Sequence, residues 1–312
     1  MNNNPNNKKC KLNMSESNPE NKLVISAALA GAITTKANNP SVPYTAEEFG
    51  DEAKKCYDAG AAIVHIHARD PEKGNPTHEL DLIKDVLENI KSKAPDVIIN
   101  LSTAISSVAT DKQRIAPVQT FKPPLASLNT ASMNFAVGDY RTGKVGMGAG
   151  NIFANTFKTI SKFAKEMKKA GTKPEMEIYD LGGLYNMLFL NRQEGAFAQP
   201  LHFQFVWGVL GGIPFSPKNL SLLLDLIPED STWSVCGVSK QQFQAGLCAA
   251  ALGGHIRVGL EDNTRVVTGE LAKGSYEQVE WAKKVAEAAG REIAQGDEAR
   301  KIFHLKKEHV QL

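Results

Sequence analysis

The chain has 312 residues, of which 42% are hydrophobic and 22% charged, and its formal net charge at pH 7 is +2. This composition is typical of a globular protein with a large apolar core, and a near-zero charge with dispersed Lys and Arg residues disfavours nucleic-acid binding. No apolar run reaches the length of about 18 residues that a membrane span needs, and the four cysteines form no C-x-x-C pair, so we predict a cytoplasmic protein without a membrane partner.

The first segment, residues 1–21, is rich in Asn, Lys, Ser and Pro. It lacks the apolar core of a signal peptide, so export is not expected. Because such a composition buries too little apolar surface to offset its ordering entropy, we predict a disordered N-terminal arm.

From residue 22 onward, short apolar or β-branched runs alternate with longer amphipathic segments, as is typical of parallel βα units. Glycines at positions 60, 171 and 290 follow three of the longer segments as helix stops. The predicted strands are Leu23 to Ala30, Ala62 to Ala68, Val97 to Thr103, Leu125 to Asn129, Glu175 to Asp180, Leu201 to Trp207, Thr232 to Val238 and His255 to Leu260. The predicted helices are Thr45 to Ala59, Glu79 to Lys93, Asp111 to Thr120, Ile152 to Ala170, Gly183 to Gln193, Lys218 to Leu226, Lys240 to Leu252 and Ser275 to Ala289.

Eight such units predict an α/β fold, namely a single-domain (β/α)8 TIM barrel over residues 22–312, with a C-terminal helical extension. The alternative is an open, doubly wound sheet. No G-x-G-x-x-G follows the first strand, and polar residues recur at the ends of many strands rather than at one crevice, so we favour the barrel.

The second predicted strand contains IVHIHARD, in which His65 and His67 are two residues apart and therefore point to the same face. At the mouth of a barrel, two such imidazoles would converge on one ion, and zinc is well served by nitrogen ligands. The alternative is a pair of histidines satisfied by neighbouring polar groups. We predict a metal site here, with zinc or another divalent ion.

The last predicted strand ends in HIRVGLEDN, which places Glu261 at a strand tip that could face the histidines across the mouth. We expect Glu261 to be the third metal ligand, although acids in this position also cap helices. Arg257 lies on the same face of the strand, where it could orient Asp262 as a general base. An ordinary structural ion pair is the alternative for Arg257 and Asp262.

Two further strand ends carry small polar side chains, in NLSTAISS and ASLNTASMN. Ser102, Thr103, Ser127 and Asn129 are candidates to bind a carboxylate or carbonyl oxygen. Ser and Thr at such junctions are also frequent caps.

With these segments laid out, the chain resembles the beta-keto acid cleavage enzymes, the family that includes 3-keto-5-aminohexanoate cleavage enzyme. The resemblance is carried by SAALAGAITT, VHIHARD, NLSTA, ASLN followed by NF, HFQFVWGVLGG, TWSVCGV and GGHIRVGLEDN, in the family's order and spacing. It implies a zinc-dependent (β/α)8 barrel, usually a homotetramer, that condenses a β-keto acid with acetyl-CoA and releases acetoacetate and a new acyl-CoA.

Carried over by position, the resemblance implies the same roles for the residues already singled out. The family's metal ligands fall on His65, His67 and Glu261, and its base and positioning arginine fall on Asp262 and Arg257. A substrate-binding serine falls on Ser102, and a substrate-contacting threonine is matched by Ser127.

Two departures concern the substrate pocket. Ile33 stands where the aminohexanoate enzyme has a glutamate that pairs the substrate ammonium, and Ala104 and Ile105 stand where it has two glycines. An aliphatic side chain cannot bind a cation, so we expect a neutral or apolar-tailed β-keto acid substrate. The alternatives are a zinc-dependent barrel aldolase or hydrolase that does not use acetyl-CoA, and a non-catalytic binding protein.

Overall fold

The computed structural model describes residues 21–105, 109–139, 141–193, 195–306 and 310–312. The arm predicted for residues 1–21 therefore lies outside the described residues, apart from Asn21. None of the helices in these ranges is long and apolar enough to cross a membrane.

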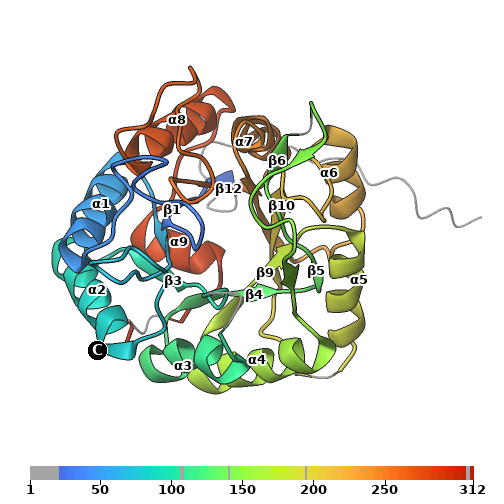
Figure 1. The fold of residues 1–312 in the computed structure, drawn as a ribbon. Helices are drawn as coiled ribbons and strands as arrows, with labels where there is room; N and C mark the ends of the chain where they lie inside the picture. The colour runs from blue at the N-terminus through green and yellow to red at the C-terminus, as the bar shows by residue number, and fades with distance from the viewer. Residues whose placement is uncertain (1–20, 106–108, 140, 194, 307–309) are drawn as a thin grey trace, which may run out of the picture.

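Eight parallel strands close into a barrel in the order β1-β12-β11-β10-β9-β4-β3-β2, and Figure 1 shows the ring enclosed by helices. The predicted (β/α)8 barrel is thus confirmed, and each predicted strand has its counterpart with shifts of a few residues at the ends. The barrel strands are β1 (Ile25–Ala30), β2 (Ile63–Ile66), β3 (Ile98–Leu101), β4 (Leu125–Asn129), β9 (Lys173–Ile178), β10 (His202–Trp207), β11 (Thr232–Gly237) and β12 (His255–Val258).

Each predicted helix has a counterpart in the described residues, with shifts at its ends, and a further short helix lies near the C-terminus, where a helical extension was predicted. Gly60 and Gly171 follow α1 and α4 with positive φ angles, as expected of helix stops. The helices are α1 (Ala46–Ala59), α2 (Leu80–Lys93), α3 (Asp111–Phe121), α4 (Phe157–Ala170), α5 (Leu181–Leu190), α6 (Pro217–Leu224), α7 (Gln241–Leu252), α8 (Ser275–Ala288) and α9 (Gly296–Ile302).

The segment between β4 and α4 differs from the prediction. It contains four two-residue strands in two antiparallel pairs, β5 (Met133–Asn134) with β8 (Ile152–Phe153) and β6 (Gly138–Asp139) with β7 (Lys144–Val145). The helix predicted from Ile152 is therefore wrong over its first residues. Helix α4 begins after Thr156, whose side chain accepts a hydrogen bond from the backbone N–H of Thr159 and so caps the helix.

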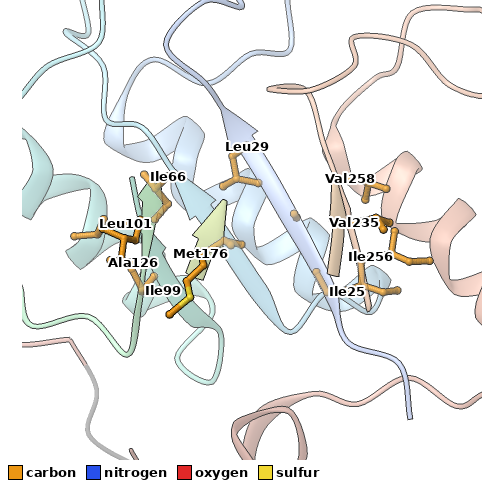
Figure 2. Close-up of a cluster of buried hydrophobic side chains, with 14 of the residues drawn as sticks. Ile25, Leu29, Ile66, Ile99, Leu101, Ala126, Met176, Val235, Ile256 and Val258 are labelled. Carbon is orange, nitrogen blue, oxygen red and sulfur yellow. The ribbon is translucent and has the colours of Figure 1, made fainter. Parts of the chain in front are cut away.

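Side chains alternate between the two faces of every barrel strand. Those that face outward pack against the helices and form the main apolar core, and Figure 2 shows part of it, with Ile25 and Leu29 from β1 and Ile256 and Val258 from β12. The intervening residues face the barrel interior, and many of them are polar. For example, the Asn100 amide on β3 donates to Glu175 on β9 at 2.7 Å, although β3 and β9 are not neighbours.

The amino-terminal end of the barrel is closed by the segment that follows α9. The Phe303 ring packs on His202 and His255, with ring centroids 4.3 and 5.0 Å apart. Its carbonyl oxygen accepts a hydrogen bond from Lys173 Nζ at 2.8 Å. The carboxyl-terminal ends of the strands form the opposite, open end, where the sequence placed its candidate site.

Candidate active site

Two imidazoles and one carboxylate meet at the open end of the barrel. His65 lies on β2 and His67 just beyond it, while Glu261 follows β12, and β1 pairs with both strands. Glu261 carboxylate oxygens lie 3.7 Å from His65 Nε2 and 3.5 Å from His67 Nε2. The three residues predicted from sequence to surround one ion are therefore brought together, with ligand atoms all within 4.8 Å of one another.

The geometry and chemistry of this cluster fit a divalent ion such as zinc. Zinc bonds to imidazole nitrogen and carboxylate oxygen are about 2.0–2.2 Å long, so two ligands of a tetrahedral ion lie about 3.3–3.6 Å apart, close to the separations here. Glu261 Oε2 is buried with no hydrogen-bond partner among the described residues. A buried, unpaired carboxylate oxygen is costly, and a bound cation would satisfy it.

Electrostatics hold two of these side chains in the forms that a cation needs. Burial lowers the pKa of His65 from 6.5 to about 3, so that its imidazole is neutral at pH 7. Burial raises the pKa of the Glu261 carboxyl, but the positive charge of Arg257 outweighs this effect and holds that pKa well below its usual range. A neutral imidazole and an ionised carboxylate are the ligand-competent species.

Arg257 is buried and joins three carboxylates beside this cluster. Its Nε and Nη2 donate to the two oxygens of Asp262 at 2.8 and 2.9 Å, a bidentate pair. Nη2 also donates to Glu261 at 2.6 Å, and Nη1 donates to Glu177 at 3.4 Å. Because Glu177 lies on β9, three strands away from β12, this last contact crosses the barrel interior.

Asp262 combines a fixed position with a raised proton affinity. Burial raises the pKa of its carboxyl, the Arg257 guanidinium opposes that rise, and the neighbouring Glu261 charge adds to it. A carboxylate held in one orientation, with its pKa moved upward toward neutral pH, suits a general base.

Of the four small polar residues predicted to bind substrate, one lines the cavity and the other three are buried and do not. Ser102 lies on the cavity wall, with its Oγ accepting from the Ala104 N–H at 3.1 Å. Thr103 and Ser127 are fully buried and bonded to each other: the Thr103 hydroxyl donates to the Ser127 carbonyl at 2.8 Å, and the Thr103 N–H donates to Ser127 Oγ at 3.1 Å. Asn129 Oδ1 accepts from the Tyr179 hydroxyl at 3.2 Å, which leaves its buried Nδ2 without a partner among the described residues.

Two titratable residues of the site were missed by sequence reasoning. Glu177 and Tyr179 both line the cavity, and the Tyr179 hydroxyl donates to Glu177 at 3.3 Å. Burial raises the pKa of Glu177 from 4.5 to about 7, with Arg257 opposing the rise. The signal was present in KPEMEIYD, where alternate polar side chains on a buried strand must share its interior face.

A cavity of about 860 Å³ opens above the cluster. Ile33 and Ala104 line it as the sequence departures suggested, together with His67, Glu261 and Asp262, whereas Ile105 lines a separate small cavity. Phe135 and Phe153 from the β5–β8 region form an apolar wall, with ring centroids 5.3 Å apart. Phe153 was missed because the segment from Ile152 onward was predicted to be helix.

Comparisons with known proteins show the family of the chain. Residues 22–305 match the family described as beta-keto acid cleavage enzyme, which confirms the resemblance seen in the sequence. The chain is 41% identical to a 3-keto-5-aminohexanoate cleavage enzyme of Fusobacterium nucleatum, over 92% of this chain and 99% of that one. It is 35% identical to a 3,5-dioxohexanoate:acetyl-CoA acetone transferase of Paraburkholderia graminis, over 91% of this chain and 96% of that one.

Solved structures support the fold. The binary complex of ObcA with oxaloacetate matches with a TM-score of 0.69 at 24% identity, covering 86% of this chain and 68% of that chain.

Proposed function

Because the chain belongs to the beta-keto acid cleavage enzyme family, we propose that it condenses a neutral or apolar-tailed β-keto acid with acetyl-CoA. The products are acetoacetate and a new acyl-CoA. The observation that carries this proposal is the juxtaposition, in one cavity, of the His65, His67 and Glu261 cluster with the bidentate Arg257 and Asp262 pair.

Zinc, or another divalent cation, is the proposed cofactor, held by His65, His67 and Glu261. When bound, such an ion stabilises negative charge that develops on the oxygens of the keto acid. The donor set of two nitrogens and one oxygen, with the unpaired Glu261 Oε2, supports this assignment. Three protein ligands leave room for substrate, unlike a structural zinc site, which closes with four.

Asp262 acts as the general base in the proposed reaction. It removes a proton from C2 of the keto acid, and the carbanion attacks the thioester carbon of acetyl-CoA, expelling the coenzyme A thiolate. The thiolate then adds to the original keto carbon, and the bond from that carbon to C2 breaks. Asp262 returns its proton to C2, so that acetoacetate and the new acyl-CoA leave with no net change in the enzyme.

Other side chains of the site bind and orient the substrate. Arg257 fixes both oxygens of Asp262 and so directs the base toward the cavity. The Ser102 hydroxyl lies on the cavity wall and supplies a donor for a substrate oxygen. Asn129 is not among the residues that line the cavity, but its buried Nδ2 has no partner among the described residues and is proposed as a second donor. Thr103 and Ser127 are fully buried and bonded to each other, so they are proposed to support the strand ends that carry Ser102 and Asn129.

The substrate tail is proposed to lie against Ile33, Ala104 and Phe153, all of which line the cavity. None of these side chains carries a negative charge that could form an ion pair with an ammonium group, so a tail without charge is favoured. The Paraburkholderia graminis relative is named for a substrate with an uncharged, oxo-bearing tail, which is consistent with this choice.

Product analysis after incubation with acetyl-CoA and a panel of β-keto acids tests the proposal directly. We expect acetoacetate and acyl-CoA to form in equal amounts, with higher kcat/KM for apolar-tailed acids than for 3-keto-5-aminohexanoate. Turnover without acetyl-CoA would instead indicate an aldolase or hydrolase. Treatment with a chelator should abolish activity, and zinc should restore it.

A homotetramer in the cytoplasm is the remaining part of the proposal. An exposed apolar face on α4 and α5 supports self-association: Phe157, Tyr185 and Phe189 are 52, 54 and 59% exposed, and the two phenylalanine rings lie 6.3 Å apart. Free thiols at Cys56, Cys236 and Cys248 are consistent with a reducing compartment. Light scattering of the purified chain measures the subunit number.

A further inference from the structure

Arg69 follows His67 by two residues and is buried, and its guanidinium donates hydrogen bonds to backbone carbonyls of two loops. Nη2 donates to the carbonyl oxygens of Gly31 and Thr34, the latter at 2.7 Å, and Nη1 donates to the Gly74 carbonyl at 2.5 Å. The guanidinium also lies 5.7 Å from the centroid of the Tyr44 ring. Arg69 therefore ties the loop that follows β1 to the loop that follows β2.

The loop that Arg69 holds is in direct contact with Glu261. The Thr34 hydroxyl donates to the Glu261 carbonyl oxygen at 3.0 Å. Gly31 lies so close to the Glu261 side chain that a Cβ atom at position 31 would be 2.4 Å from Glu261 Cγ. Thr34 thus holds the Glu261 backbone through this hydrogen bond, and Gly31 restricts the positions that the Glu261 side chain can take.

We propose that Arg69 is a positioning residue, which sets the placement of the Glu261 carboxylate through Gly31 and Thr34. The inference rests on the metal site of the proposed function. It assigns Arg69 no contact with substrate or metal. Its effect passes through the loop after β1, which also carries Ile33 to the cavity wall.

An arginine suits this task for a geometric reason. Its planar guanidinium presents five donors in a fixed fork and so reaches three carbonyl oxygens of two loops at once. A lysine ammonium at the same place is a compact point charge on a flexible stem and would hold the loops less firmly. A methionine would fill much of the volume and donate to none of the carbonyls.

The chain offers a matched control in Arg291. This side chain is also buried and also donates to backbone carbonyl oxygens, among them Gly254 at 2.7 Å and Lys22 at 3.1 Å. It lies at the amino-terminal end of the barrel, since Gly254 immediately precedes β12, whereas Glu261 lies beyond the strand's carboxyl end. Loss of Arg291 removes similar bonds far from Glu261.

The test measures the zinc affinity of the full-length apoprotein by competition with a chromogenic chelator, for wild type, Arg69→Met, Arg69→Lys and Arg291→Met. Loss of a group that orients a metal ligand typically weakens metal affinity by about 10- to 100-fold. We expect that loss for Arg69→Met, a smaller loss for Arg69→Lys, and wild-type affinity for Arg291→Met. Circular dichroism shows which variants are folded. If Arg69→Met does not fold, the zinc affinity of Arg69→Lys is compared with those of the wild type and Arg291→Met.

Wild-type zinc affinity in a folded Arg69 variant would overturn the inference while leaving the proposed function intact. Equal weakening in the Arg69 and Arg291 variants would also overturn it, because the effect would then be general destabilisation. Absence of zinc binding by the wild type would refute the metal site of the proposed function, and this inference with it.

Discussion

Replacing Gly31 by alanine should disturb the geometry of the His65, His67 and Glu261 cluster while leaving the stability of the barrel almost unchanged. The added Cβ would lie 2.4 Å from Glu261 Cγ and 2.9 Å from Glu261 Cδ. Because carbon atoms in contact rest about 3.5–4.0 Å apart, the gap must open by at least about 1 Å. The Gly31 carbonyl is held by Arg69, so we expect the longer Glu261 side chain to move.

A displacement of this size has different consequences for function and for stability. Misplacing a group at a reaction centre by about 1 Å can reduce turnover about 100-fold. Overpacking costs about 1–3 kcal/mol, and we expect the lower end of that range because a flexible side chain absorbs the clash. Gly31→Ala should therefore fold normally and yet lose about two orders of magnitude in kcat.

The assay combines steady-state kinetics, zinc affinity and thermal unfolding of Gly31→Ala. Gly150→Ala is the matched control, because a Cβ at that exposed position meets nothing within 4 Å. If Gly31→Ala kept both the kcat and the zinc affinity of the wild type, Glu261 would not need its observed position, and our reading of the site would fail.

Three further predictions follow from the same structure. Asp262→Asn should reduce kcat by about 10²- to 10⁴-fold with zinc content unchanged, as measured by kinetics and metal analysis; loss of zinc would show that Asp262 has another role. Ile33→Glu should raise kcat/KM for 3-keto-5-aminohexanoate by about 10-fold or more relative to a neutral acid, since a charge-assisted hydrogen bond contributes about 1.5–3 kcal/mol, and an unchanged ratio would place the substrate tail elsewhere. Burial lowers the pKa of Lys173 from 10.5 to about 8, so its charge destabilises the folded state by about 3 kcal/mol below pH 8, and the penalty disappears as the pH rises to 10.5. Urea unfolding measures the free energy of unfolding of Lys173→Met and of the wild type. The value for Lys173→Met minus that for the wild type should fall by about 3 kcal/mol as the pH rises from 8 to 10.5. A difference that stays constant with pH would mean that the pKa of Lys173 is not lowered in the folded state.

Much of the fold could be predicted because the relevant patterns are local. A short apolar, β-branched run is a property of consecutive residues, so it located the strand that carries His65 and His67, and the two-residue period of a strand put both on one face. The same rule placed Arg257 on the inner face of the last strand. The helix at 152–156 was mispredicted because two-residue strands are too short to show a period, and an apolar run there matched a helix equally well.

The arrangement of the site depended on closure of the barrel. Sequence determined which side chains lie at strand ends, but only the tertiary structure brought Glu177 on β9 to Arg257 on β12, across the interior. Likewise, nothing local in the sequence shows that Arg69 reaches the carbonyls of Gly31 and Thr34, or that Gly31 lies against Glu261. The physical reason is that a strand's period fixes the direction of each side chain, whereas the neighbours it meets depend on the register and order in which distant strands and loops assemble.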